Sequence, residues 1–211
     1  MTTDPATGLR PLIIACGALV GDLRAVLHAN ALTDSIEVCY LPANLHNDPQ
    51  RIVPAVRARL DDARRGGRAA FVAYADCGTG GRLDAMLEDF ADVRRLPGSH
   101  CYEFFAGHDT FARLHDEEIG TFYLTDFLAK HFDALVWSGL GLDRHPELRD
   151  QYFGRYTRVL HLTQSNDAVA IQAGRDAASR LGLRHEVLVT GRERFAAEIA
   201  FVPRGYQRVS P

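Results

Sequence analysis

Short apolar runs alternate with amphipathic stretches along most of this chain, and that alternation limits the fold more than any other feature of the sequence. Runs typical of strands are at 12–16, 36–41, 69–75, 134–138, 159–163 and 186–190, with a further edge strand expected at 199–202. Helical spacing of apolar residues follows at 18–32, 49–65, 82–90, 124–132, 146–156 and 167–181. This order predicts an α/β fold of the doubly wound, Rossmann-like kind, with a mostly parallel sheet covered by helices on both faces.

The length of the chain and the absence of a linker within it favour one domain. Its 211 residues can bury one sizeable core, and no linker, repeat or low-complexity segment divides them. We therefore expect a single α/β domain over residues 11–203. A flexible N-terminus (1–10) and a C-terminal tail (204–211) would flank it.

Charge and hydropathy argue against two classes of partner. The formal net charge of −3 gives no basic signature for nucleic acid. The sequence begins with no signal peptide, and no apolar run approaches the roughly 18 residues that span a bilayer. These features predict a cytoplasmic protein that acts on a small-molecule substrate. In that compartment its four cysteines are expected to be reduced.

Cysteines stand where predicted strands end, and this placement indicates a site. Cys16 closes the first strand, His46 follows the second, Cys77 follows the third, and Cys101 comes after one more helix. The carboxyl ends of parallel strands meet at one edge of a sheet, so these four residues can converge. Three thiolates and an imidazole suit zinc, and an iron–sulfur cluster is the alternative. Burial as inert thiols stays open, most of all for Cys16.

Neighbouring residues supply further candidates. The turn at Gly78 and Gly80 offers backbone N–H groups for an anion, so we assign these glycines, with Asn47, as cofactor-binding; a plain strand-to-helix turn is the alternative. His100 and Asp109 are candidate catalytic acid–base groups, although loop residues of this kind are often only solvated. Cys77 activated by the next helix and by His100 would be a nucleophile. Serine-hydrolase and zincin motifs are absent from the sequence.

Several segments, read together and in order, resemble a bacterial and archaeal family known as domain of unknown function 1638. They are Ile13–Leu19, Leu41-Pro42, Leu45–Asn47 with Pro49, Tyr74, Cys77-Gly78 with Gly80, the Cys101 segment, and Gly120–Thr125. The chain departs from the family pattern in one place, where Ser99-His100-Cys101 stands instead of a His-Asp-Cys triplet. The resemblance implies a cytosolic α/β protein, often encoded beside corrinoid proteins and their methyltransferases, with no assigned reaction.

These observations lead to competing hypotheses about function. The first is a metal-binding protein, with zinc as the expected metal, that acts as an enzyme of methyl-group or one-carbon metabolism. The second is a non-catalytic accessory or small-molecule-binding protein that partners a corrinoid protein or methyltransferase. The remaining hypotheses are an iron–sulfur protein and an enzyme with a cysteine nucleophile.

Overall fold

The computed structural model describes residues 9–200 and residue 202. Nearly all of the expected flexible N-terminus (1–10) and the whole C-terminal tail (204–211) lie outside the described residues. The chain forms two compact units: the first takes the residues up to Phe104 and those from Glu193 onward, and the second takes Phe105–Arg192. Each unit carries its own parallel sheet, which confirms the α/β, Rossmann-like class although the strands divide between two sheets. A single domain over 11–203 stays a prediction.

The first unit contains a four-stranded parallel sheet. Its strand order is β2 (Glu37–Leu41), β1 (Leu12–Cys16), β3 (Ala70–Ala73) and β4 (Arg94–Arg95). Every residue of β1 is buried, as expected for a central strand whose sheet is covered on both faces.

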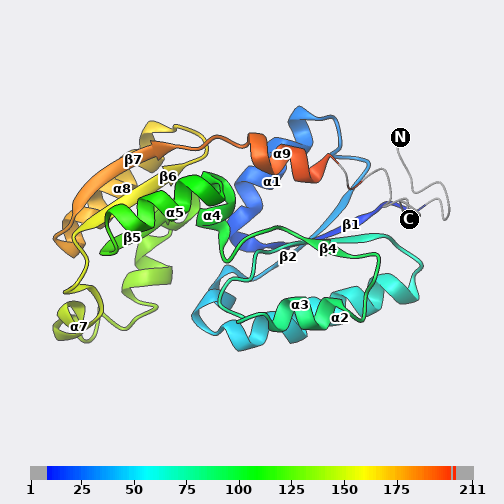
Figure 1. Ribbon diagram of the computed structural model, residues 1–211, viewed down its shortest axis with the longest axis horizontal. Coiled ribbons are helices and arrows are strands. Elements are labelled where there is room, and N and C mark those ends of the chain that lie inside the picture. Colours follow the sequence, from blue (N-terminus) through cyan, green and yellow to red (C-terminus); the bar gives the residue numbers. More distant parts are fainter. Residues whose placement is uncertain (1–8, 201, 203–211) are drawn as a thin grey trace. The chain divides into compact units, whose positions relative to one another are not determined.

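Helices cover both faces of this sheet (Figure 1). One face carries α1 (Val20–Ala29) and α9 (Glu193–Ile199), and the other carries α2 (Ile52–Arg65) and α3 (Arg82–Leu87). The α4 helix (Cys101–Ala106) follows β4 in the chain.

The strand order of the first unit reverses direction at β1. The chain passes from β1 to β2 on one side, and then to β3 on the other side of β1. In open α/β sheets such a switch point opens a crevice at the carboxyl ends of the strands, where ligands bind. Gly17 follows β1 there, and a Cβ atom at this position would lie 2.8 Å from the carbonyl oxygen of Leu41. Only glycine lets the two chain segments approach so closely.

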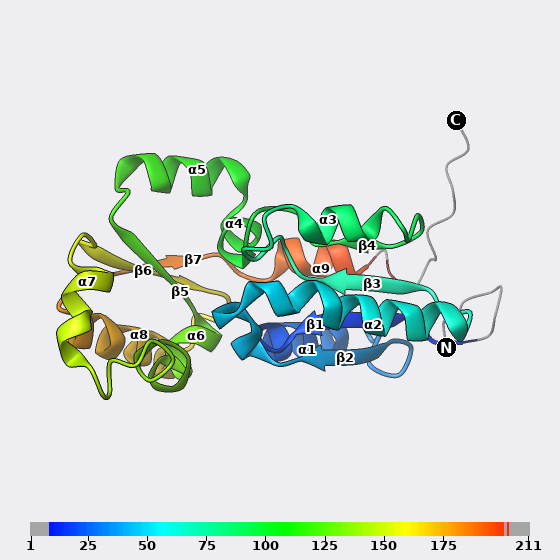
Figure 2. The same ribbon diagram turned by 90° about the horizontal axis from the view of Figure 1, so that it is seen from below.

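The second unit contains a three-stranded parallel sheet in the order β5 (Thr121–Thr125), β6 (Arg158–Thr163) and β7 (Arg184–Val189). Helix α5 (His108–Glu117) lies on one side of it, and α6 (Asp126–Lys130) and α8 (Ala168–Leu181) lie on the other (Figure 2).

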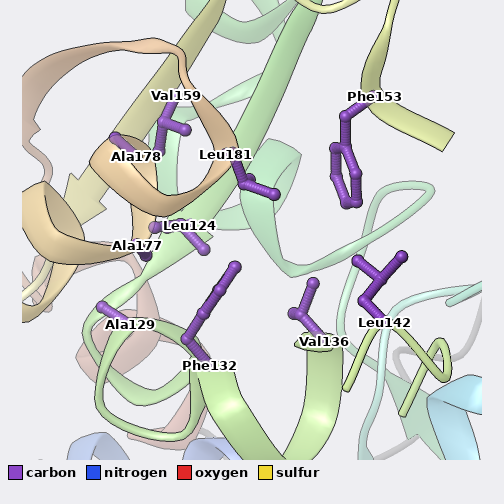
Figure 3. Packing of buried hydrophobic residues seen from close by; sticks show 10 residues of the cluster. All are labelled: Leu124, Ala129, Phe132, Val136, Leu142, Phe153, Val159, Ala177, Ala178 and Leu181. Atoms are coloured by element: carbon purple, nitrogen blue, oxygen red, sulfur yellow. The ribbon is translucent and has the colours of Figure 1, made fainter. Parts of the chain in front are cut away.

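An apolar core fills the space under α8. Figure 3 shows its side chains, which come from β5, β6, α6, α8 and the segment between α6 and β6. They are Leu124, Ala129, Phe132, Val136, Leu142, Phe153, Val159, Ala177, Ala178 and Leu181. Phe153 comes from α7 (Arg149–Phe153).

Three sequence expectations about single elements differ from the structure, the second of them only in its bounds. The run 134–138 is not a strand, because Asp133–Trp137 forms a π-helical turn. The helix expected at 124–132 begins at Asp126, after the unexpected strand β5. The edge strand expected at 199–202 is excluded at its start, since Ile199 ends helix α9. Short apolar runs fit a buried strand and a buried helical turn equally well, which explains the first and third errors.

Candidate functional site

The four predicted metal ligands lie at the end of, or in the segments that follow, the strands of the first unit. Cys16 is the last residue of β1, and His46 lies on a 3₁₀ segment, Ala43–Asn47, that follows β2. Cys77 follows β3, and Cys101 begins α4. All four residues therefore belong to the unit that contains the switch point.

Three of the thiols are buried, and two of them lie close enough to another thiol for its charge to affect their ionisation. Burial raises the pKa of Cys16 to about 11. Burial and then the charge of Cys16 raise the pKa of Cys77 to about 12. The pKa of Cys101 is raised well above its usual value by burial and by the charges of Cys77 and Cys16. The structure thus brings these three residues together as neutral thiols.

His46 lies beside this group. Its Nδ1 atom is 3.8 Å from the Sγ atom of Cys16 and 3.0 Å from the carbonyl oxygen of Ala43. Because a carbonyl only accepts hydrogen bonds, Nδ1 carries the proton of that contact and Nε2 holds the lone pair. Burial lowers the pKa of His46, and the Ala43 contact opposes this only in part. The imidazole is therefore neutral near pH 7.

Tyr74 is a member of the cluster that sequence reasoning did not assign to the site. Its ring stacks on that of His46, with centroids 6.1 Å apart, and the residue is 1% exposed. Its hydroxyl has no hydrogen-bond partner of normal geometry, although it faces the Cys16 thiol. Burial and the charge of Cys16 both raise the pKa of Tyr74. The signal for it was a polar aromatic residue directly after β3 and three residues before Cys77.

The backbone at Cys77 is strained. Its φ angle is +51°, a left-handed conformation that side chains rarely adopt and that costs about 1–3 kcal/mol. The Cys77 amide donates to the carbonyl of Ser99, which holds the strained residue in place. A glycine would occupy this position at lower cost. A cysteine at residue 77 therefore costs stability that a glycine would spare.

The glycine turn after Cys77 is already occupied by a side chain. The carboxylate of Asp76 accepts hydrogen bonds from the amides of Gly80 at 2.9 Å and Gly81 at 2.8 Å, and from the Thr79 hydroxyl at 2.5 Å. These two amides are therefore not free to hold an anion in this conformation. The cofactor-binding role of Gly78, Gly80 and Asn47 stays a prediction.

The two predicted acid–base residues fall in different units. His100 precedes α4, and its Nδ1 atom accepts a hydrogen bond from the Glu103 amide at 3.4 Å. Asp109 lies in the first turn of α5, in the second unit. Their catalytic roles stay predictions.

The thiol cluster does not have the geometry of a preformed metal site. Among the described residues, no group of three or more Cys, His, Asp or Glu side chains stands in an arrangement that could hold a metal ion. The Sγ atom of Cys16 instead accepts a hydrogen bond from the Ala18 amide at 3.3 Å. To bind an ion, the thiols would have to lose their protons and turn toward it.

Comparison with known proteins identifies the family. A family model described as "Protein of unknown function (DUF1638)" matches residues 40–198, so the chain belongs to this family, as its motifs indicated. No curated protein and no solved structure matches the chain significantly. Among the described residues, every helix is too short or too polar to cross a bilayer.

Proposed function

We propose that this chain binds one zinc ion through the thiolates of Cys16, Cys77 and Cys101. The observation that carries the proposal is the burial of these thiols in the unit that contains the switch point, where the charge of Cys16 raises the pKa of Cys77 and the charges of both raise that of Cys101. Buried thiols whose pKa values are raised in this way need a nearby positive charge to become thiolates. A zinc ion supplies that charge, since a coordinating thiol is deprotonated outright.

The raised pKa values of the three thiols make the affinity for zinc depend on pH. Each thiol must release a proton before it can bind zinc, so affinity rises with pH and binding releases protons. The strained backbone of Cys77 supports a functional role for its sulfur, because a residue of no use there would cost stability for nothing.

His46 and Tyr74 suit supporting roles around such an ion. The Nδ1–H group of His46 lies between Ala43 and the sulfur of Cys16, and it would strengthen its contact once that sulfur became a thiolate. The buried Tyr74 hydroxyl would gain the acceptor that it lacks. Outer contacts of this kind orient metal ligands and tune their basicity. The predicted role of His46 as a direct fourth ligand requires its ring to turn away from Ala43.

Three protein ligands leave one position of a tetrahedral zinc ion open. Open positions are typical of catalytic zinc sites, whereas structural sites are closed. We therefore favour an enzyme that binds a small-molecule substrate at this position, in methyl-group or one-carbon metabolism. Zinc–thiolate centres activate thiols as methyl acceptors, which fits the corrinoid context that the family resemblance implies. Four free cysteines support the reducing cytoplasm as its compartment.

Metal analysis of protein purified without added metal tests the proposal. We expect about one equivalent of zinc, and we expect Cys16→Ser, Cys77→Ser and Cys101→Ser each to lower it sharply. Cys39→Ser is the matched control, because Cys39 lies within β2 rather than at a strand end. Metal-free protein that also fails to take up zinc on reconstitution at pH 8 would overturn the proposal.

The same preparation separates the alternatives. An iron–sulfur protein would contain iron and sulfide and absorb visible light. A non-catalytic accessory protein with inert thiols would contain no metal, and a chelator would not change the rate at which its thiols are alkylated. The proposed zinc site predicts faster alkylation of Cys77 and Cys101 after chelation.

A further inference from the structure

A second buried cluster lies in the second unit, away from the thiol residues in sequence. His161, on β6, is fully buried, and its Nε2 atom is 2.9 Å from the carboxylate of Asp126. That carboxylate also accepts hydrogen bonds from the amide of Ser165 at 2.9 Å and from its hydroxyl at 2.5 Å. Burial raises the pKa of Asp126, but hydrogen bonds from His161, Ser165 and Thr163 outweigh it, so that the pKa lies below its usual range. The carboxylate is therefore charged, and Nε2 of His161 is its donor.

In its neutral form, His161 has a lone pair on the nitrogen that does not face Asp126. A neutral imidazole that donates through Nε2 has its acceptor at Nδ1. Nδ1 of His161 is buried without a hydrogen-bond partner, and so is Nε2 of His185 on β7. The two rings are neighbours, with centroids 5.9 Å apart. Buried polar atoms nearly always have a hydrogen-bond or metal partner. Two nitrogens on adjacent rings that both lack one therefore indicate a partner that the two rings share.

Gly174 shows that both nitrogens face the same place. A Cβ atom on Gly174 would lie 2.5 Å from Nδ1 of His161 and 3.0 Å from Nε2 of His185. Gly174 lies inside helix α8, where glycine costs roughly 0.5–1 kcal/mol relative to alanine. The glycine keeps the space between helix and imidazoles clear of a side chain.

We propose that His161 Nδ1 and His185 Nε2 are the two protein ligands of a divalent transition-metal ion that prefers imidazole, such as Zn²⁺. An imidazole ligand generally donates its other N–H group to a carboxylate, as His161 does to Asp126. Zinc–nitrogen bonds of about 2.0–2.1 Å allow one ion to lie between rings spaced as these are. The His185 residue is partly exposed, although its Nε2 atom is buried, so an ion would have to enter past the His185 ring from the β7 side.

The charge state of the pair fits this role. Burial lowers the pKa of His185, and repulsion from Arg175, and from His161 whenever that ring is protonated, lowers it further. His185 is therefore neutral at pH 7 and has a lone pair to give. The described residues gather no third protein ligand, so the site would be weaker than the thiol site and open to solvent ligands.

Imidazole nitrogen resonances of the full chain, labelled with ¹⁵N at histidine, test this site. On addition of Zn²⁺ at pH 7 we expect Nδ1 of His161 and Nε2 of His185 to shift together and to saturate. His145, which is exposed on a loop, is the control and should not follow the same curve. The His185→Gln variant should abolish the shift at His161. Gly174→Ala should do the same, because its methyl group would occupy the space between the nitrogens.

The outcomes are separable from those of the thiol proposal, because each resonance reports one residue of the second unit. If the two nitrogens stay unshifted at millimolar Zn²⁺, their common partner is a buried water or a shared proton, and the metal site is wrong. Unchanged shifts in Gly174→Ala would overturn it as well. Should either variant fail to fold, the titration of the unmodified chain still decides.

Discussion

At the scale of single residues, Cys77 shows how backbone strain and chemistry can be separated by experiment. Its left-handed conformation disfavours any residue with a Cβ atom. We expect Cys77→Gly to be more stable than Cys77→Ala by about 1 kcal/mol, since both lack the thiol but only glycine relieves the strain. Urea denaturation of the metal-free variants measures the difference. Equal midpoints would show that the conformation at residue 77 costs nothing.

At this scale, the sequence predicted which cysteines belong to the site better than it predicted which other side chains contact them. Cys16 and Cys77 could be placed together because the first ends and the second follows a recognisable buried strand, and parallel strands share one edge. Cys101 was placed with them only because it comes one helix later in the chain; it begins α4 after the short strand β4, which is not buried. Tyr74 and the pairing of His161 with His185 could not be found in this way. Their roles depend on which face of a strand meets which side chain, and that register is set by tertiary packing.

At the scale of elements, the junction of β5 and α6 depends on one charged side chain. Asp126 links the start of α6 to the loop after β6 through Gln164 and Ser165, and to β6 itself through His161. We expect Asp126→Asn to lower the free energy of unfolding by about 2 kcal/mol at pH 7, because an amide cannot replace a carboxylate that accepts from all of these donors.

The pH dependence of that loss has a defined sign. The folded-state pKa of Asp126 is depressed, so its contribution is full above the pKa of an unfolded aspartate, near 4, and is lost as the pH falls toward the folded value. The difference between the native chain and Asp126→Asn, measured by urea denaturation, should therefore shrink between pH 5 and pH 3. A difference that stays constant over this range would contradict a charged, hydrogen-bonded Asp126.

Element prediction from the sequence succeeded where a strong signal marked both ends. Helix α8 begins at the residue after Asp167, whose side chain caps it, and ends at Gly182 in a left-handed conformation. The prediction failed at 134–138, an apolar run that contributes Val136 to the core from a π-helical turn. Nothing in a run of that length distinguishes the two structures before the surrounding core is known.

At the scale of the whole molecule, each of the two units has buried aromatic residues of its own. Phe195 of α9 is fully buried in the first unit, where its ring meets Phe104 edge-on at 5.7 Å. Phe153 is buried in the core of the second unit. The single tryptophan, Trp137, packs against this second core, while the four cysteines all lie in the first unit. Tryptophan fluorescence and thiol exposure therefore report the two units separately.

A pair of matched substitutions tests whether the units unfold separately. Phe195→Ala should cost about 4 kcal/mol and lower the urea midpoint for thiol exposure more than that for Trp137 fluorescence, because the cavity opens in the first unit. Phe153→Ala should produce the opposite order for the same reason. If both variants move both midpoints equally, the units unfold as one cooperative body, as the sequence expectation of a single domain over 11–203 implies. Separate midpoints would instead show that the thiol site can open while the second unit stays folded.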